Sequence, residues 1–129
     1  MEEFFEMPSK RTILVVDDEK EMRDRYRAAL EKENFRVIEA PDALETANLL
    51  MRDSSSIDLI LLDINIEEID GRDIFDIIDQ YDPTLQVMVS SVHPINDQKL
   101  KIPRAAEYHN KADGEKILLK KVKHILGMN

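Results

Sequence analysis

The 129-residue sequence contains no cysteine, and this absence excludes several kinds of site. Without thiols the chain has no disulfide framework, no thiolate nucleophile and no cysteine-ligated metal centre. A chain without disulfides suits a reducing compartment, and we therefore expect a cytoplasmic protein. No apolar run approaches the roughly 18 residues that cross a bilayer, so we expect no membrane insertion.

Glycine is also scarce, with three residues in the whole chain. No Gly-x-Gly-x-x-Gly loop follows the first apolar run, which argues against a dinucleotide-binding Rossmann domain. The net charge of −9 disfavours direct binding of nucleic acid. The acidic N-terminal segment lacks the basic start and apolar stretch of a signal peptide. We expect residues 1–10 to be a loose tail and residues 11–129 to be one domain.

What the sequence does contain is an alternation of short apolar runs with amphipathic stretches. The apolar runs predict strands over Thr12–Val16, Phe35–Glu39, Asp58–Leu62, Leu85–Ser90 and Ala106–His109. The periodic stretches predict helices over Lys20–Glu33, from Pro41–Asp42 onward, after a turn at Asp70–Gly71, over Pro94–Ile102 and over Lys116–Leu126. On the first helix an apolar stripe is formed by Met22, Tyr26, Ala29 and Leu30.

This alternation predicts an α/β fold with helices on both faces of a parallel sheet. Five strands favour the doubly wound, flavodoxin-like (βα)5 arrangement with strand order 2-1-3-4-5. The fourth helix has the least apolar pattern, since it has only Ile95, Leu100 and Ile102 to bury. Its burial therefore depends on these three side chains.

Polar side chains stand at the carboxyl ends of the predicted strands, which is where ligands bind in this class of fold. Asp17 and Asp18 follow the first strand, and Asp63 follows the third. Ser90 ends the fourth strand, and Lys111 lies just beyond the fifth. In the order 2-1-3-4-5, the first strand neighbours the third, and the fourth and fifth follow beyond it. We therefore expect the three carboxylates, the hydroxyl and the ammonium to converge on one edge of the sheet.

Such a group of residues is suited to phosphoryl transfer. Two carboxylates about 4 Å apart repel each other by roughly 4 kcal/mol at an effective dielectric constant near 20, and a divalent cation offsets this repulsion. Hard oxygen ligands without histidine or cysteine favour Mg²⁺, with Mn²⁺ as an alternative. Asp63 can then act as the nucleophile, while Ser90 and Lys111 bind the oxygens of the transferred group.

Each of these residues also has an ordinary structural explanation. Taken alone, Asp17 or Asp18 is equally well explained as the N-cap of the next helix, with Glu21 completing a capping box behind Asp18. Asp63 alone is typical of a turn after a strand, and a lone lysine such as Lys111 is most often a solvated surface charge. Their joint occurrence at the strand ends favours the functional interpretation.

Four segments, LVVDDE, LILLDINIEEIDG, QVMVSS and EYHNKAD, resemble in this order the receiver domain of two-component response regulators. The resemblance covers nearly the whole chain and implies a phosphoaspartate signalling switch. It implies that Asp63 is the phosphoacceptor. It also implies a Mg²⁺ site in which Asp18 touches the ion directly, Asp17 acts through water and Asn65 offers its backbone carbonyl.

The same resemblance implies the residues and partners of the switch. Ser90 matches the switch serine or threonine, Tyr108 the rotating aromatic residue, and Lys111 the lysine that pairs with the phosphate. The implied phosphoryl donor is a histidine kinase or a histidine phosphotransfer protein. On phosphorylation, Tyr108 is expected to turn inward and to remodel the surface of the fourth helix, fifth strand and fifth helix for a downstream protein.

Such a domain is not an enzyme beyond self-catalysed phosphoryl transfer and slow autodephosphorylation, and it is expected to be a monomer or a phosphorylation-dependent dimer. Two positions depart from the family, because Glu67 and Ala112 stand where prolines are usual. At Ala112 we expect a trans peptide and a reshaped loop, since a cis bond before a residue other than proline costs about 3 kcal/mol.

Two alternatives stay open. One is a pseudo-receiver, which binds a protein without being phosphorylated. The other is a haloacid-dehalogenase-like phosphatase, which also uses a strand-end aspartate with Mg²⁺. Such a phosphatase needs a second aspartate two residues after the nucleophile, where this chain has Asn65.

Overall fold

The computed structural model describes residues 10–64 and 70–128 of the chain. Residues 1–9, most of the expected N-terminal tail, lie outside the described residues, as do Asn65 and Glu67. Within the described ranges, no helix has both the length and the apolar character needed to cross a membrane.

A parallel sheet lies at the centre of the described structure. Its strands are β1 (Thr12–Val16), β2 (Arg36–Ala40), β3 (Leu59–Asp63), β4 (Val87–Ser91) and β5 (Glu107–Asn110). The strand order is β2-β1-β3-β4-β5, which confirms the predicted flavodoxin-like arrangement. A parallel partner requires a crossover connection, and the amphipathic stretches between the strands provide it.

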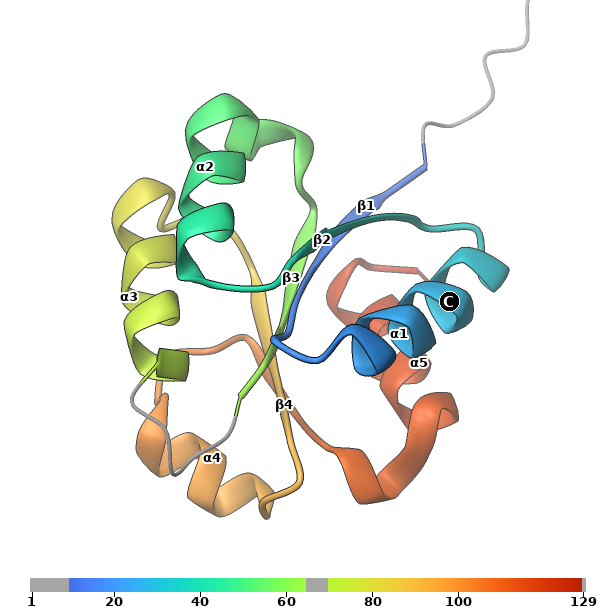
Figure 1. Cartoon of the computed structure of the whole chain (residues 1–129). Coiled ribbons are helices and arrows are strands. Elements are labelled where there is room, and N and C mark those ends of the chain that lie inside the picture. The colour runs from blue at the N-terminus through green and yellow to red at the C-terminus, as the bar shows by residue number, and fades with distance from the viewer. Residues whose placement is uncertain (1–9, 65–69, 129) are drawn as a thin grey trace, which may run out of the picture.

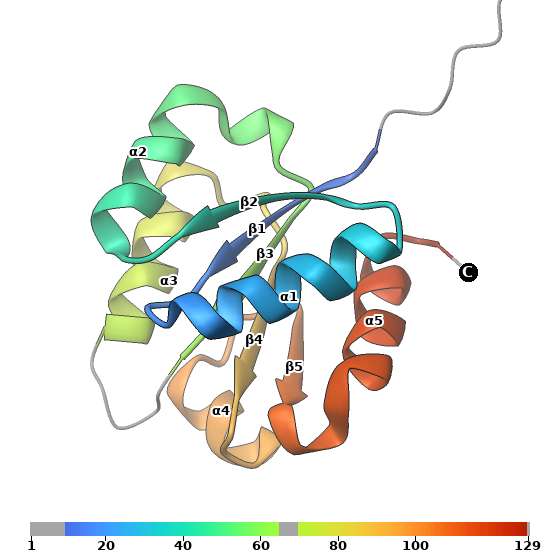
Figure 2. The ribbon, with the colours of Figure 1, turned by 45° about the vertical axis from the view of Figure 1, so that its right-hand side comes forward.

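The α-helices of the described structure are α1 (Lys20–Lys32), α2 (Ala43–Asp53), α3 (Asp70–Tyr81), α4 (Ile95–Lys101) and α5 (Gly114–Ile125). Short 3₁₀ helices are η1 (Ser54–Ser56) and η2 (Lys111–Asp113). Helices α1 and α5 cover one face of the sheet, and α2, α3 and α4 cover the other (Figures 1 and 2).

The sheet separates two hydrophobic clusters. Ile13 and Val15 of β1 pack on the α1–α5 side, whereas Leu14 and Val16 pack on the α2–α4 side. This alternation follows from the opposite directions of successive side chains in a strand. Because helices cover both faces, the strands are apolar almost throughout, which is the pattern that the sequence shows.

The predicted elements are present, and two of their boundaries matter for function. Strand β3 continues through Asp63 and β4 continues through Ser91, each one residue further than predicted. Asp63 and Ser90 therefore lie within the strand ladder. The predicted turn at Asp70–Gly71 is wrong, because α3 already begins at Asp70.

Helix α4 is present but buries different residues from those expected. Leu100 was predicted to be buried, and this is wrong, since it is 84% exposed. Gln98 is fully buried instead, and Ile102 at the end of the helix is buried as predicted. The Gln98 side-chain amide donates hydrogen bonds to the carbonyls of His93, at 2.8 Å, and His109, at 2.9 Å. These two bonds satisfy the N–H groups of the amide, whereas its oxygen is buried without a partner among the described residues.

Candidate functional site

The strand register places three of the predicted site residues in one row at the carboxyl edge of the sheet. Asp63 pairs directly with Ser90 across β3 and β4. Val16 pairs with Leu62, so Asp17, the next residue, lies beside Asp63. By strand alternation, the side chains of this row project toward the face covered by α1 and α5.

Lys111 reaches this row from the end of β5. Its Nζ atom lies 2.5 Å from Oδ2 of Asp63. The Asp63 side chain is 6% exposed and the Lys111 side chain is 23% exposed, so the ion pair is largely shielded from water. The structure therefore brings together the predicted acceptor and the predicted lysine in a charge-assisted contact.

Asp17 is buried, and its two carboxylate oxygens have different surroundings. Oδ1 accepts a hydrogen bond from the backbone N–H of Glu19 at 2.9 Å. Oδ2 is buried and has no hydrogen-bond partner among the residues that the structure describes. The alternative that Asp18 is the N-cap of the first helix is wrong, because the N-cap of α1 is Glu19.

The pair of carboxylates from Asp17 and Asp63 fits a hard divalent cation. A buried carboxylate oxygen without a partner is costly, and an ion that prefers oxygen ligands removes that cost. Asp18 is exposed, and residues 10–64 and 70–128 contain no group of three or more acidic or histidine side chains placed to hold an ion. In the described structure, therefore, two of the three predicted carboxylates converge, those of Asp17 and Asp63, and Asp18 does not join them. The carbonyl of Asn65, a predicted ligand, lies outside the described residues.

The Asp63 carboxyl has an altered acidity. Burial, reinforced by the neighbouring Asp17 side chain, raises the pKa of Asp63 from 3.8 to about 8, although Lys111 acts in the opposite direction. The net rise in the pKa of Asp63 means that the Lys111 ammonium does not fully offset the effects of burial and of the nearby Asp17 carboxylate. The site therefore favours additional positive charge.

Tyr26 of α1 is a site residue that the sequence analysis missed. It was assigned to the apolar stripe of the helix, and its ring does pack in the α1–α5 cluster. Its hydroxyl, however, lies 2.9 Å from Oγ of Ser90 and donates to Oδ2 of Asp63 at 3.3 Å. Burial, followed by the charge of Asp63, raises the pKa of the Tyr26 phenol. A phenol in an otherwise apolar stripe was the available signal, because a buried tyrosine hydroxyl usually has a polar partner.

Tyr108 lies on the opposite face of the sheet, within the α2–α4 cluster. The residue is 5% exposed, and its hydroxyl donates to the backbone carbonyl of Ile102 at the end of α4. The ammonium of Lys99 lies 5.7 Å from the centre of the ring, and Lys121 of α5 donates to the Tyr108 carbonyl at 2.6 Å. The Tyr108 ring is thus already buried in the described structure. That it moves inward from an exposed position on phosphorylation stays a prediction.

The peptide bond before Ala112 has the trans form expected from the missing proline, whereas a reshaped loop stays a prediction. The Lys111–Ala112 peptide is trans, and it opens the 3₁₀ helix η2. The Ala112 N–H donates to the side-chain oxygen of Asn110 at 3.0 Å. Proline has no N–H and could not make this bond.

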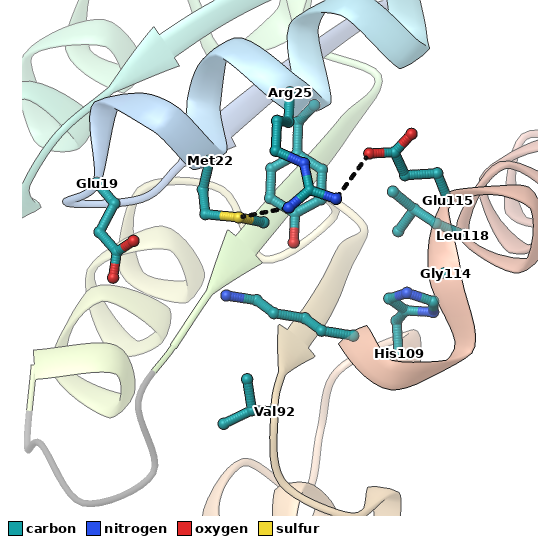
Figure 3. Close-up of a pocket in the computed structure, with 10 residues that line it drawn as sticks. Glu19, Met22, Arg25, Val92, His109, Gly114, Glu115 and Leu118 are labelled. Carbon is teal, nitrogen blue, oxygen red and sulfur yellow. Dashed lines mark hydrogen bonds and ion pairs between the residues drawn. The ribbon is translucent and has the colours of Figure 1, made fainter.

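A cavity of about 360 Å³ opens between α1 and α5, next to the row (Figure 3). Met22 and Leu118 line it from the two helices, and Tyr26 and Lys111 also belong to its lining. Arg25 lies across it and pairs with Glu115 at 3.3 Å. The lysine end of the row therefore has an opening between the two helices.

Comparisons with known proteins agree on one family. A family model described as the response regulator receiver domain matches residues 13–123. Transcriptional regulatory protein CpxR of Escherichia coli K12 is 31% identical over 115 residues, which cover 88% of this chain and 48% of CpxR. A probable transcriptional regulatory protein of Picosynechococcus is 31% identical over 91 residues, which cover 67% of this chain and 36% of that protein. The chain thus spans about half, or less, of the length of these curated relatives.

Solved structures show the same likeness. A response regulator from Thermotoga maritima has a TM-score of 0.79 and 28% identity, and the match covers 92% of this chain and 99% of that one. The response regulator TrrA of the same organism, in complex with Mg²⁺ and BeF, has a TM-score of 0.75 and 28% identity. That match covers 90% of this chain and 99% of TrrA.

Proposed function

The chain belongs to the receiver domain family of response regulators, and from this premise we propose that it is a phosphoaspartate switch with Asp63 as acceptor. The donor is a histidine kinase or a histidine phosphotransfer protein, and residues 11–129 form the receiver domain. The observation that best supports this is the buried row itself, in which Asp63 contacts Lys111 at 2.5 Å and pairs with Ser90 across the strands.

The transfer forms an acyl phosphate on Asp63. A carboxylate oxygen bonds to phosphorus while the bond from phosphorus to the donor's imidazole nitrogen breaks. The imidazole keeps the electron pair of that bond and takes up a proton. Lys111 compensates the charge of the transferred group, and the Ser90 hydroxyl donates to one of its oxygens.

We propose Mg²⁺, with Mn²⁺ as an alternative, as the cation of this site. Asp17, Asp18, Asp63 and the Asn65 carbonyl would hold it, directly or through water. When bound, it supplies positive charge to the phosphoryl oxygens. Two observations support this: Oδ2 of Asp17 is buried beside Asp63 without a partner among the described residues, and TrrA, a structural relative, has been solved with Mg²⁺ and BeF.

The output surface is proposed to be that of α4, β5 and α5, with Ser90 and Tyr108 as switch residues. Tyr108 supports this proposal, because it lies in β5 and contacts Ile102 after α4 and Lys121 of α5. Phosphorylation then shifts the population between two states of this surface. We propose that the domain acts in the cytoplasm, as a monomer or a phosphorylation-dependent dimer, on a downstream protein and without direct contact to nucleic acid.

The direct test is incubation with acetyl phosphate and Mg²⁺, followed by intact mass measurement. We expect one added phosphoryl group, its loss in Asp63→Asn, and its retention in Asp76→Asn, a matched control at an exposed aspartate of α3. If no donor or metal condition adds mass, the chain is a protein-binding module that is not phosphorylated. Rapid turnover of small phosphomonoesters would instead indicate a phosphatase.

A further inference from the structure

Three buried polar groups meet beneath α1: the hydroxyls of Tyr26 and Ser90 and the carboxyl of Asp63. Tyr26 is 3% exposed, Ser90 is fully buried, and the Asp63 side chain is 6% exposed. Ser90 Oγ lies 2.9 Å from the Tyr26 hydroxyl, and it makes this contact although Asp63 is its direct neighbour across the strand pair. Buried hydroxyls are nearly always hydrogen-bonded, so this contact satisfies the Ser90 side chain in the described state.

The number of protons decides how the three groups are bonded. A phenol and a serine hydroxyl each donate one hydrogen bond, and an ionised carboxylate only accepts. When Asp63 is ionised, which is the form that attacks phosphorus, all three groups are satisfied if Ser90 donates to Tyr26 and Tyr26 donates to Asp63. In this arrangement the Ser90 proton is directed at α1 and is not available to the acceptor.

Phosphorylation of Asp63 requires the opposite arrangement. The phosphoryl oxygens need the Ser90 hydroxyl as a donor, so the bond from Ser90 to Tyr26 has to break. We propose that Tyr26 is a positioning residue that holds Ser90 in the resting state and thereby opposes the active state. This inference rests on the proposed function of Asp63 and Ser90, and it assigns to α1 a restraint on the switch.

The variant Tyr26→Phe tests the inference, because it keeps the buried ring and removes only the hydroxyl. Beryllofluoride with Mg²⁺ serves as the probe of the active state, and the amide signal of Ser90 is followed by NMR. We expect the half-saturating beryllofluoride concentration to fall about threefold to tenfold, the equivalent of one buried hydrogen bond. Tyr81→Phe is the matched control, since Tyr81 is 46% exposed on α3, and it should bind like the wild type.

A double-variant cycle separates action through Ser90 from a general effect of the substitution. In a Ser90→Ala background, Tyr26→Phe should leave the beryllofluoride affinity unchanged, because the restrained hydroxyl is gone. If the gain persists in that background, or if Tyr26→Phe alone binds beryllofluoride no better than the wild type, the inference is overturned. A wild-type protein that binds no beryllofluoride at any Mg²⁺ concentration would overturn the proposed function, and this inference with it.

Discussion

Asp63 occupies a buried position in which its neighbours act on its ionisation in opposite directions. Burial and the adjacent Asp17 favour the neutral acid, whereas Lys111 favours the carboxylate. The net result is a pKa of about 8, so the protein keeps a costly arrangement of charges at this edge of the sheet. Groups with strongly shifted pKa values concentrate at functional sites, because their geometry serves chemistry and not stability.

The first prediction concerns the pH dependence of stability without metal. The pKa of Asp63 in the folded state, about 8, is higher than its ordinary value of 3.8, so the folded state binds this proton more tightly than the unfolded state. The free energy of unfolding should therefore fall as the pH rises through this range and level off above it. Asp63→Asn removes the titration and should be more stable than the wild type at pH 8, by on the order of several kcal/mol, since each unit of pKa difference corresponds to about 1.4 kcal/mol.

Urea denaturation in EDTA at pH 5 and pH 8 measures this difference. Asp76→Asn should follow the wild type at both pH values, because it changes an exposed carboxylate of α3, which covers the opposite face of the sheet. If the free energy of unfolding depends on pH in the same way in the wild type and in Asp63→Asn, the raised pKa of Asp63 is contradicted.

At the scale of the element, side-chain hydrogen bonds connect α4 and the residues beside it to β5. The helix has seven residues, and its fully buried side chain is the amide of Gln98. Gln98 links the carbonyl of His93, before the helix, to that of His109 in β5. Tyr108 adds a second link through the carbonyl of Ile102. The position of α4 on β5 thus depends on a few directional contacts, which suits an element proposed to change on signalling.

The second prediction follows from these contacts. Gln98→Ala leaves one buried and one partly buried carbonyl without this donor and opens a space in the packing, and it should lower the free energy of unfolding by about 2 kcal/mol. Leu100→Ala is the matched control in the same helix, since Leu100 is 84% exposed, and it should cost less than about 0.5 kcal/mol. Urea denaturation compares the two variants. Equal costs would contradict the proposed role of the Gln98 hydrogen bonds in holding α4.

At the scale of the whole molecule, the chain has a net charge of −9 and gathers two acidic side chains at one buried edge. The sheet makes this possible, because two hydrophobic clusters, one on each face, stabilise the fold independently of the edge. A cation that binds the folded state and not the unfolded chain stabilises the entire domain through mass action.

The third prediction is that Mg²⁺ raises the thermal midpoint of the wild type. At a free concentration about 100 times the dissociation constant, the stabilisation should be about 2.7 kcal/mol. Asp17→Asn should lose most of this gain, and Asp76→Asn should keep it. NaCl at matched ionic strength controls for screening of the net charge. An equal gain with NaCl, or an undiminished gain in Asp17→Asn, would contradict a cation site at this edge.

Much of the site was accessible from the sequence. Strand and helix types, the strand order, and the positions of Asp63, Ser90 and Lys111 followed from local patterns: apolar runs, helical periodicity and polar residues at strand ends. All strands of a parallel sheet end at the same edge, so polar residues that follow different strands lie close together there. The trans peptide at Ala112 was predicted in the same way, from the identity of one residue.

Only the tertiary structure decided which side chains complete the site. The Tyr26 hydroxyl finds partners 37 and 64 residues away, and Gln98 bonds to a carbonyl 11 residues away. The tertiary structure also separates Asp17, which is buried beside Asp63, from its exposed neighbour Asp18. Periodicity shows which face of an element is buried, but the partner of a buried polar atom depends on how the elements pack against one another.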